Sequence, residues 1–513
     1  MEESRHADRR RRERNRARAD EPTRQHECWH TRLPGYVAYR KPNCHWRCIM
    51  NDSGSNALTS RSAHMVEHLL SLRFDRLPEP LVREARIRLL DGFGCGIYGA
   101  LMPWGRITAE VVYDEQSQGP ATIYGNRKPA AAARAALANG TATHGIELDD
   151  ISPGAHVHPG AVVIPAALAT AERCEVSGAQ LLLGVIAGYE AMTRVGRAIG
   201  EAGWGFHITG VAGPVGAAVA SGVVQGFSVD KMLRAIGIAC SSASGIKSFT
   251  QGSGGMIKRM HAGRAAESGV IACALAERGF TAPLAALDGK FGLLEVFGGD
   301  QSRPDELDKA LGENYAISRV WTKVYPCCGV LHTTAQALHA LRLQNGLEPE
   351  AIGNVRVGTN KRAIALNGEI APKETMAAQY SMPFTAAVAL TRDPRDPRHY
   401  TGEALDDPEV CDLARRVELY ADAEMEAMYP RYGTRAEVIL KDGRKFDTRL
   451  LDAHGTPADP CSEDEAQDKF RCLAGVAIGR DAIDTIVSLV SGIDKLASVG
   501  PLSESLRDGS KTQ

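Results

Sequence analysis

Long hydrophobic runs and a charge excess of either sign are both missing from this 513-residue sequence. A membrane-spanning helix needs about 20 mostly apolar residues, and the nearest stretch, 207–230, is interrupted by glycines and a proline. Lys and Arg number 60 against 62 Asp and Glu, whereas nucleic-acid binders usually carry a basic excess. The N-terminus also has no secretory leader pattern. We therefore expect a soluble cytoplasmic protein that binds neither membranes nor nucleic acid.

A disulfide framework and a nucleotide-binding motif are missing too. The 12 cysteines are scattered, and several lie in apolar or helical stretches, which is typical of reduced thiols and not of a disulfide framework. The Gly- and Ser-rich stretch 244–255 lacks the GxxxxGK[ST] order of a phosphate-binding loop.

The first 50 residues differ from the rest. They hold 13 Lys and Arg against 7 Asp and Glu, and they have no apolar stripe to bury. We predict a disordered basic tail over residues 1–55, or a chain that begins at Met50. An RNA- or membrane-binding arm is an alternative, and so is a zinc site, although the spacing matches no common zinc motif. The residues of that zinc reading are His26, Cys28, His30, Cys44, His45 and Cys48.

Residues 56–319 predict a large all-helical domain, so the expected fold class is mainly α. Apolar residues recur three or four positions apart over 81–90, as on one face of a helix. Alanine-rich stretches, whose small side chains let helices approach closely, follow at 129–143, 162–173, 179–199, 213–224, 230–240 and 262–278.

Strand patterns begin after about residue 320, which predicts a smaller α+β lid domain over 320–452. Residues 354–358 alternate like a half-buried strand. Asp442-Gly443 separates two alternating runs, a strong signal for a hairpin. Helices are expected at 333–345 and 408–416.

The C-terminal segment 453–505 returns to a helical pattern, at 463–476 and 480–497. We expect these helices to pack back on the helical domain. The polar tail after Ser503 is expected to fray.

The densest polar cluster runs from 144 to 160, in a Gly- and Pro-rich loop between helical stretches. It favours a general acid/base centre or a divalent-metal site, because histidine titrates near neutral pH. The alternative is that its acids cap a turn while its histidines lie on the surface. The polar residues are His144, Glu147, Asp149, Asp150, His156 and His158.

Two later segments place basic side chains at helix starts. His207 precedes an uncharged helix and has glycines on both sides, whose N–H groups can approach an anion; a helix-capping role is the alternative. Lys258, Arg259, His261 and Arg264 follow the Gly/Ser loop and suit a polycarboxylate, with lysine holding a carboxylate or acting as a base. A solvated helix start is the alternative there.

The lid carries two shorter motifs. Cys327-Cys328 has too few thiolates nearby for an iron–sulfur cluster, so we interpret it as a turn at the domain junction, with His332 near the cleft. Tyr380 lies beside a rigid Met-Pro turn and by itself would be ordinary core.

Taken together, these segments make the chain resemble the MmgE/PrpD family, which includes 2-methylcitrate dehydratase, cis-aconitate decarboxylase and iminodisuccinate epimerase. The resemblance covers about residues 57–503 in the expected order. The segments that carry it are Asp91–Cys95, His144–Gly160, Gly205–Pro214, Lys258 with His261–Gly263, Gln379–Phe384 and Gly455–Phe470.

The resemblance implies a large helical domain with an α+β lid, usually dimeric, and an active site between them. It implies action on small polycarboxylates with no metal, iron–sulfur cluster or other obligate cofactor. It also implies that His158, His207 and Lys258 are catalytic. The candidates for substrate binding are Glu147, Asp149, Asp150, Arg259, His261, Arg264, Cys328, His332 and Tyr380.

Three positions depart from the family pattern: Glu147 replaces the first acid of Asp-x-Asp-Asp, Ile151 replaces a frequent Thr, and Cys328 replaces a histidine of some relatives. The leading hypothesis is a cofactor-independent lyase, a dehydratase or decarboxylase, of a substrate such as 2-methylcitrate or cis-aconitate. An epimerase and a non-catalytic polycarboxylate-binding protein are the alternatives.

In the lyase hypothesis, Lys258 neutralises a substrate carboxylate and the charge that develops beside it. His158 and His207 are the acid and the base, in either order. An acid of the 144–160 cluster orients His158.

Overall fold

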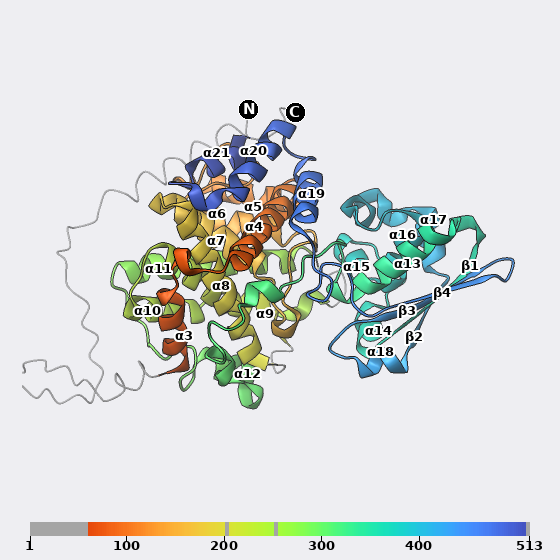
Figure 1. Ribbon diagram of the computed structural model, residues 1–513, viewed down its shortest axis with the longest axis horizontal. Coiled ribbons are helices and arrows are strands. Elements are labelled where there is room, and N and C mark those ends of the chain that lie inside the picture. The colour runs from red at the N-terminus through yellow and green to blue at the C-terminus, as the bar shows by residue number, and fades with distance from the viewer. Residues whose placement is uncertain (1–59, 201–204, 251–254, 509–513) are drawn as a thin grey trace, which may run out of the picture. The chain divides into compact units, whose positions relative to one another are not determined.

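The computed structural model describes residues 60–200, 205–250 and 255–508 (Figure 1). The predicted basic tail and its zinc and RNA alternatives lie outside the described residues. The described residues belong to one compact unit, and most of their secondary structure is helical. The predicted mainly α fold class is thereby confirmed.

The first part of the chain forms a helical lobe, which we define as residues 60–321. Its centre is α9, of which every residue is buried and against which α7, α8, α10 and α11 pack. The helices are α3 (Arg61–Ser71), α4 (Glu79–Ala100), α5 (Pro103–Asp114), α6 (Ala132–Thr143), α7 (Gly160–Cys174), α8 (Gly178–Ile199), α9 (Ile208–Val224), α10 (Val229–Cys240), α11 (Ile257–Glu277) and α12 (Leu293–Gly298).

Small residues set the spacing of α6 and α11. A Cβ atom at Gly263 would lie 2.3 Å from both the carbonyl oxygen of Leu137 and Oγ1 of Thr141, so only glycine allows this approach. The contact matters for the site because the polar loop begins where α6 ends, and Lys258 lies in the first turn of α11.

The second part of the chain contains a four-stranded sheet in the order β2-β1-β3-β4. The predicted hairpin is confirmed, since β3 (Thr434–Leu440) pairs antiparallel with β4 (Lys445–Leu450). The predicted strand at 354–358 is also confirmed, as β1 (Ile352–Thr359). An unpredicted strand, β2 (Val417–Ala421), runs parallel to β1.

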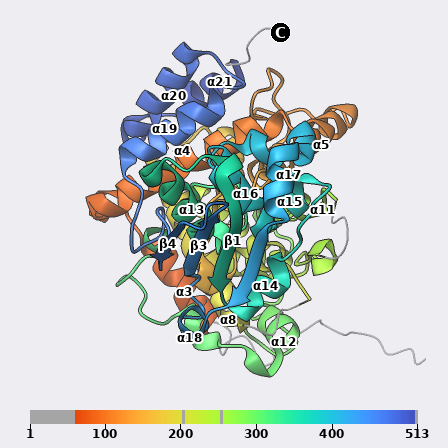
Figure 2. The same cartoon turned by 90° about the vertical axis from the view of Figure 1, so that its right-hand side faces the viewer.

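Helices cover this sheet, and α13 and α16 contact both it and each other (Figure 2). Every residue of α16 is buried. We define residues 322–452 as the sheet lobe. Its helices are α13 (His332–Asn345), α14 (Lys361–Asn367), α15 (Thr375–Gln379), α16 (Met382–Thr391), α17 (Pro408–Ala414) and α18 (Ala423–Ala427).

Three helices end the described chain: α19 (Glu463–Ala474), α20 (Arg480–Ser491) and α21 (Gly500–Asp508). Both α19 and α20 pack on α4 (Figures 1 and 2). The expected fraying after Ser503 is wrong, because α21 continues to Asp508 and fully buries Leu506. A helix to residue 497 was also too long, since α20 ends before Gly492.

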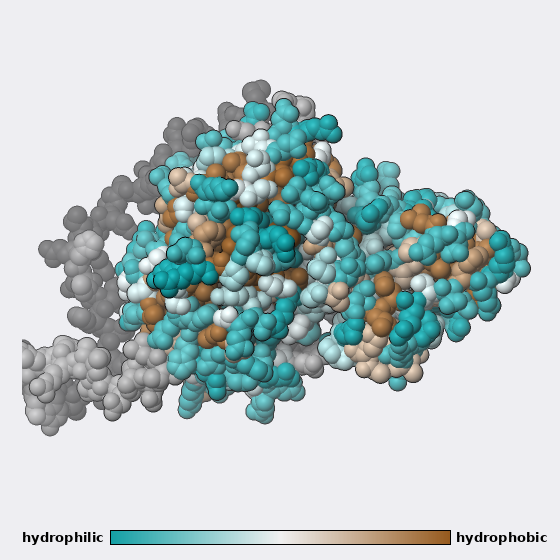
Figure 3. Space-filling model, viewed as in Figure 1, coloured by the Kyte–Doolittle hydropathy of each residue, from teal (hydrophilic) through white to brown (hydrophobic). Residues whose placement is uncertain are grey.

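None of the described helices is long and apolar enough to span a membrane. The face of the molecule in Figure 3 is largely hydrophilic, with hydrophobic residues in separate small patches.

Candidate active site

A cavity of about 1290 Å³ is lined by residues of both lobes. The helical lobe contributes His158, His207 and Lys258, and the sheet lobe contributes Cys328 and Tyr380. Side chains predicted from five separate sequence segments therefore meet in one place.

The charged lining of this cavity is mainly basic. Among the described lining residues, the acids are Glu306 and Glu369. The further basic residues are Arg197, Lys247, Arg303, Arg319, Arg362 and Arg431. A concave surface with this charge balance attracts anions and raises their local concentration.

One buried carboxylate, that of Asp149, connects two imidazoles of the polar loop. Its Oδ2 atom lies 2.7 Å from Nδ1 of His144 and 3.2 Å from Nδ1 of His158. Although burial alone would raise it, the two imidazoles lower the pKa of Asp149 well below its usual value. A carboxylate at Nδ1 fixes the ring orientation and leaves Nε2 as the atom that exchanges a proton.

His207 occupies the N-cap position of α9. Its Nδ1 lies 3.2 Å from Nδ1 of His261, and its ring stacks on His144 with centroids 5.4 Å apart. Burial, together with the neighbouring His144 and His158, lowers the pKa of His207 well below its usual value. Burial also lowers the pKa of His144 to about 3. Both rings are therefore neutral near pH 7.

Lys258 belongs to a buried group of three charges. It donates a hydrogen bond to the carboxylate of Glu147, whose other oxygen lies 3.0 Å from Nζ of Lys323. Burial and the Lys323 ammonium lower the pKa of Lys258 well below its usual value, while the Glu147 carboxylate favours the charged form. The Lys258 ammonium also lies 5.3 Å from the ring centroid of Tyr380.

Glu147 reaches both lysines from a left-handed backbone conformation, with φ of +55°. Such a conformation is uncommon for a residue with a side chain, and it persists only where the surroundings fix it. Glu147 therefore acts on the lysines, while Asp149 is the acid that contacts His158. Lys323 was not predicted, because a lone lysine ahead of Tyr325-Pro326 carries no sequence signal.

Two further residues predicted to bind substrate, Asp150 and Arg259, do not line the cavity. Asp150 accepts hydrogen bonds from the Gly160 N–H at 2.8 Å and the Tyr189 hydroxyl at 2.6 Å, and burial raises its pKa to about 6. Arg259 donates to the Gly145 carbonyl at 2.9 Å and lies over the ring of Trp104. These residues shape the polar loop from behind.

The two remaining candidates are also outside the lining. His332 is buried edge-on against Tyr325, and burial lowers its pKa to about 3. The Arg264 side chain is half exposed on α11 and pairs with Glu267. Arg264 is not among the residues that line the cavity.

Backbone contacts hold the polar loop against the second part of the chain. The Gln379 side chain donates to the Ile146 carbonyl at 2.9 Å, and the Cys328 N–H donates to the Gln379 carbonyl at 2.8 Å. On α19, the Lys469 ammonium donates to Asp91 at 2.5 Å and to the carbonyls of Leu148 and Lys323 at 2.7 and 2.8 Å.

Ligand atoms of His144, Asp149 and His158 lie within 4.8 Å of one another, so their spacing alone would allow a metal ion. The contact from His144 to Asp149 pairs Nδ1 of the ring with Oδ2 of the carboxylate without a metal ion. The arrangement equally suits two imidazoles oriented by a shared carboxylate, as in general acid/base sites.

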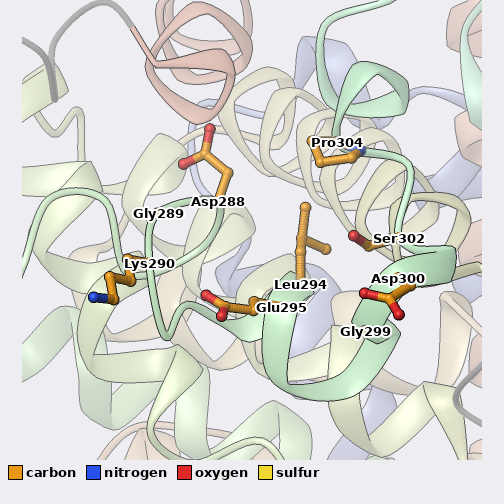
Figure 4. A pocket seen from close by; sticks show the side chains of 9 residues that line it. All are labelled: Asp288, Gly289, Lys290, Leu294, Glu295, Gly299, Asp300, Ser302 and Pro304. Carbon is orange, nitrogen blue, oxygen red and sulfur yellow. The ribbon is translucent and has the colours of Figure 1, made fainter.

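A second hollow of about 480 Å³ lies elsewhere in the helical lobe (Figure 4). The Asp288 carboxylate in its wall accepts hydrogen bonds from the N–H and hydroxyl of Ser62, in α3, at 3.0 and 2.7 Å. Glu295 accepts from the N–H of Phe291 at 2.5 Å. Both acids are therefore engaged in hydrogen bonds with nearby residues.

Comparison with known proteins identifies the family of this chain. The MmgE/PrpD N-terminal domain matches residues 63–305 and the MmgE/PrpD C-terminal domain matches residues 325–492. The chain therefore belongs to the MmgE/PrpD family. This membership makes it an enzyme of the lyase type, of the dehydratase and decarboxylase group.

Curated relatives align over most of their length. Cis-aconitate decarboxylase from Aspergillus terreus is 28% identical over 481 residues, covering 89% of this chain and 97% of the relative. The cis-aconitate decarboxylase-like protein oryM from Aspergillus oryzae is 27% identical, covering 86% and 96%. Cis-aconitate decarboxylase from Mus musculus is 25% identical, covering 85% and 91%.

Proposed function

We propose that this chain decarboxylates a small unsaturated tricarboxylate, with cis-aconitate as the first candidate substrate. The observation that carries the proposal is the charge of the cavity. Among its described lining residues, seven Lys and Arg side chains stand against two carboxylates, beside the imidazoles of His158 and His207. Such a lining suits a compact polyanion, and the names of the aligned relatives suggest which one.

Lys258 and the basic side chains around it bind the substrate carboxylates. Because Lys258 is buried, its charge acts in a medium of low dielectric, where its interaction with an anion is stronger than in water. The Glu147 carboxylate beside it keeps the ammonium form available.

The bond changes follow from the structure of the substrate. Loss of carbon dioxide breaks the carbon–carbon bond to the carboxylate of the CH₂–COO⁻ arm. The electron pair spreads over the three allylic carbons, next to a retained carboxylate whose charge Lys258 stabilises. A proton added to the far carbon then gives itaconate, so each turnover consumes one proton.

His158 is the proton donor in this proposal. Asp149, 3.2 Å from its Nδ1, stabilises a positive charge on the ring while it holds the proton. His207 is neutral, which suits it to accept a hydrogen bond or a proton.

Proton NMR in D₂O tests the proposal, with separate incubations of cis-aconitate, 2-methylcitrate, citrate and iminodisuccinate. Itaconate signals from cis-aconitate, with one deuterium in the new methylene, are the expected result, and Lys258→Ala should lose them. An alkene formed from a hydroxy acid would replace the proposal with a dehydratase. Deuterium exchange alone would replace it with an epimerase, and binding without turnover with a binding protein.

A further inference from the structure

Three side chains of metal-binding types meet far along the chain from the catalytic residues. His454 lies in the loop after β4, Cys461 precedes α19, and Glu465 lies in the first turn of α19. Their ligand atoms all lie within 4.8 Å of one another. None of the three lines the catalytic cavity.

The spacing of the nitrogen and the sulfur fits one tetrahedral ion. The Nε2 atom of His454 lies 3.6 Å from Sγ of Cys461. With zinc–nitrogen bonds of about 2.0–2.1 Å and zinc–sulfur bonds of about 2.3 Å, a tetrahedral ion separates these atoms by about 3.6 Å. The same Nε2 lies 2.9 Å from Oε1 of Glu465, a hydrogen bond that an ion between the two atoms would replace.

Hydrogen bonds and ion pairs with neighbouring residues already orient the side chains of His454 and Glu465. Oδ2 of Asp459 lies 3.1 Å from Nδ1 of His454, the carboxylate–histidine contact that commonly supports a metal-bound imidazole. The second oxygen of Glu465 accepts hydrogen bonds from the N–H and hydroxyl of Ser462, each at 2.8 Å. Oε1 of Glu465 and Nε2 of His454 are thereby turned towards the same point.

We propose that His454, Cys461 and Glu465 bind a divalent cation of the zinc type, with water as the fourth ligand. The His454 side chain is 27% exposed and that of Glu465 is 51% exposed, so an ion can enter from solvent. A thiolate, an imidazole and a carboxylate together favour zinc over the hard cations magnesium and calcium, which prefer oxygen ligands.

The ion would stiffen the connection between the sheet lobe and α19. The His454 N–H donates to the Gln336 side chain of α13 at 2.7 Å, and the Gly455 carbonyl accepts from the Thr322 N–H at 2.9 Å. One turn beyond Glu465, Lys469 contacts the catalytic loop. The proposed role is structural, so it stands independently of the reaction assigned above.

Cobalt(II) serves as the spectroscopic probe, on the full chain after treatment with a chelator. We expect a cobalt–thiolate charge-transfer band that Cys461→Ser and His454→Asn both lose. Cys472→Ser is the matched control, because Cys472 lies exposed on the same helix and should leave the band unchanged. Zinc titration should likewise show one equivalent fewer in Cys461→Ser than in Cys472→Ser.

Thermal unfolding provides the second readout. Zinc should raise the melting temperature of the wild type and of Cys472→Ser, and it should raise that of Cys461→Ser less. If Cys461→Ser keeps the band, the metal stoichiometry and the zinc-induced shift of the control, the proposal is wrong. Circular dichroism confirms that each variant is folded before the comparison.

Discussion

The Oδ2 atom of Asp149 lies 3.2 Å from Nδ1 of His158, and both side chains are buried. The neighbouring Asp150 points elsewhere, to Tyr189 and the backbone of Gly160. Two adjacent buried acids therefore have different partners: Asp149 contacts an imidazole that lines the cavity, and Asp150 contacts a hydroxyl and a backbone N–H.

Asp149→Asn keeps the size of the side chain and removes its charge. The imidazolium form of His158 loses its counter-charge, so kcat should fall about 10²-fold or more, within the usual range for acid/base catalysis. Steady-state kinetics on the identified substrate measure the loss. Asp150→Asn is the control, and it should keep kcat close to the wild-type value while changing the melting temperature.

Glu147→Gln leaves the Lys258 and Lys323 ammonium groups buried without their shared carboxylate. Breaking a buried ion pair in this way usually costs about 3–5 kcal/mol in the free energy of unfolding, which urea denaturation measures. A bound tricarboxylate would return negative charge to Lys258. It should therefore raise the melting temperature of Glu147→Gln more than that of the wild type, and an equal rise would contradict this account.

Arg319 lines the cavity, whereas Arg264 pairs with Glu267 outside it. Arg319→Gln should raise KM about tenfold, the equivalent of about 1.4 kcal/mol. It should change kcat little, because a carboxylate contact made equally before and during the reaction affects binding alone. Arg264→Gln should leave both constants unchanged. An equal effect of the two substitutions would show that net charge alone matters.

The pH dependence of kcat/KM reports the role of Lys258. Burial lowers its pKa below the ordinary 10.5, so the substrate-binding ammonium form is lost as pH rises through that lowered value. We expect kcat/KM to fall on the alkaline side below pH 10.5. In Lys258→Arg the charge persists, and any residual activity should not show this fall. A rise of kcat/KM with pH would instead make the lysine a base.

Much of the fold could be predicted from local pattern. The Asp442-Gly443 turn and the alternation around it located β3 and β4, and the alanine-rich stretches located α6 to α11. Strand β2 was missed because Val417–Ala421 does not alternate along its length, since its last three residues are all apolar. The end of α21 was missed because Leu502 and Leu506 become buried only through tertiary packing.

For the candidate site, the sequence predicted several of the residues but not the contacts between them. Residue type and resemblance together selected His158, His207 and Lys258, and all three line the larger cavity. The sequence could not predict which basic side chain each acid contacts. Glu147 and Asp149 are only two positions apart, and the left-handed φ of Glu147 turns their side chains to different partners. Lys323 joins the group across 176 positions, a contact that no local pattern encodes.

The Lys469 ammonium holds Asp91 of the first long helix, the Leu148 carbonyl of the polar loop and the Lys323 carbonyl at once. During synthesis, both lobes are translated before this cation. The polar loop of the nascent protein therefore lacks this anchor until α19 has been made.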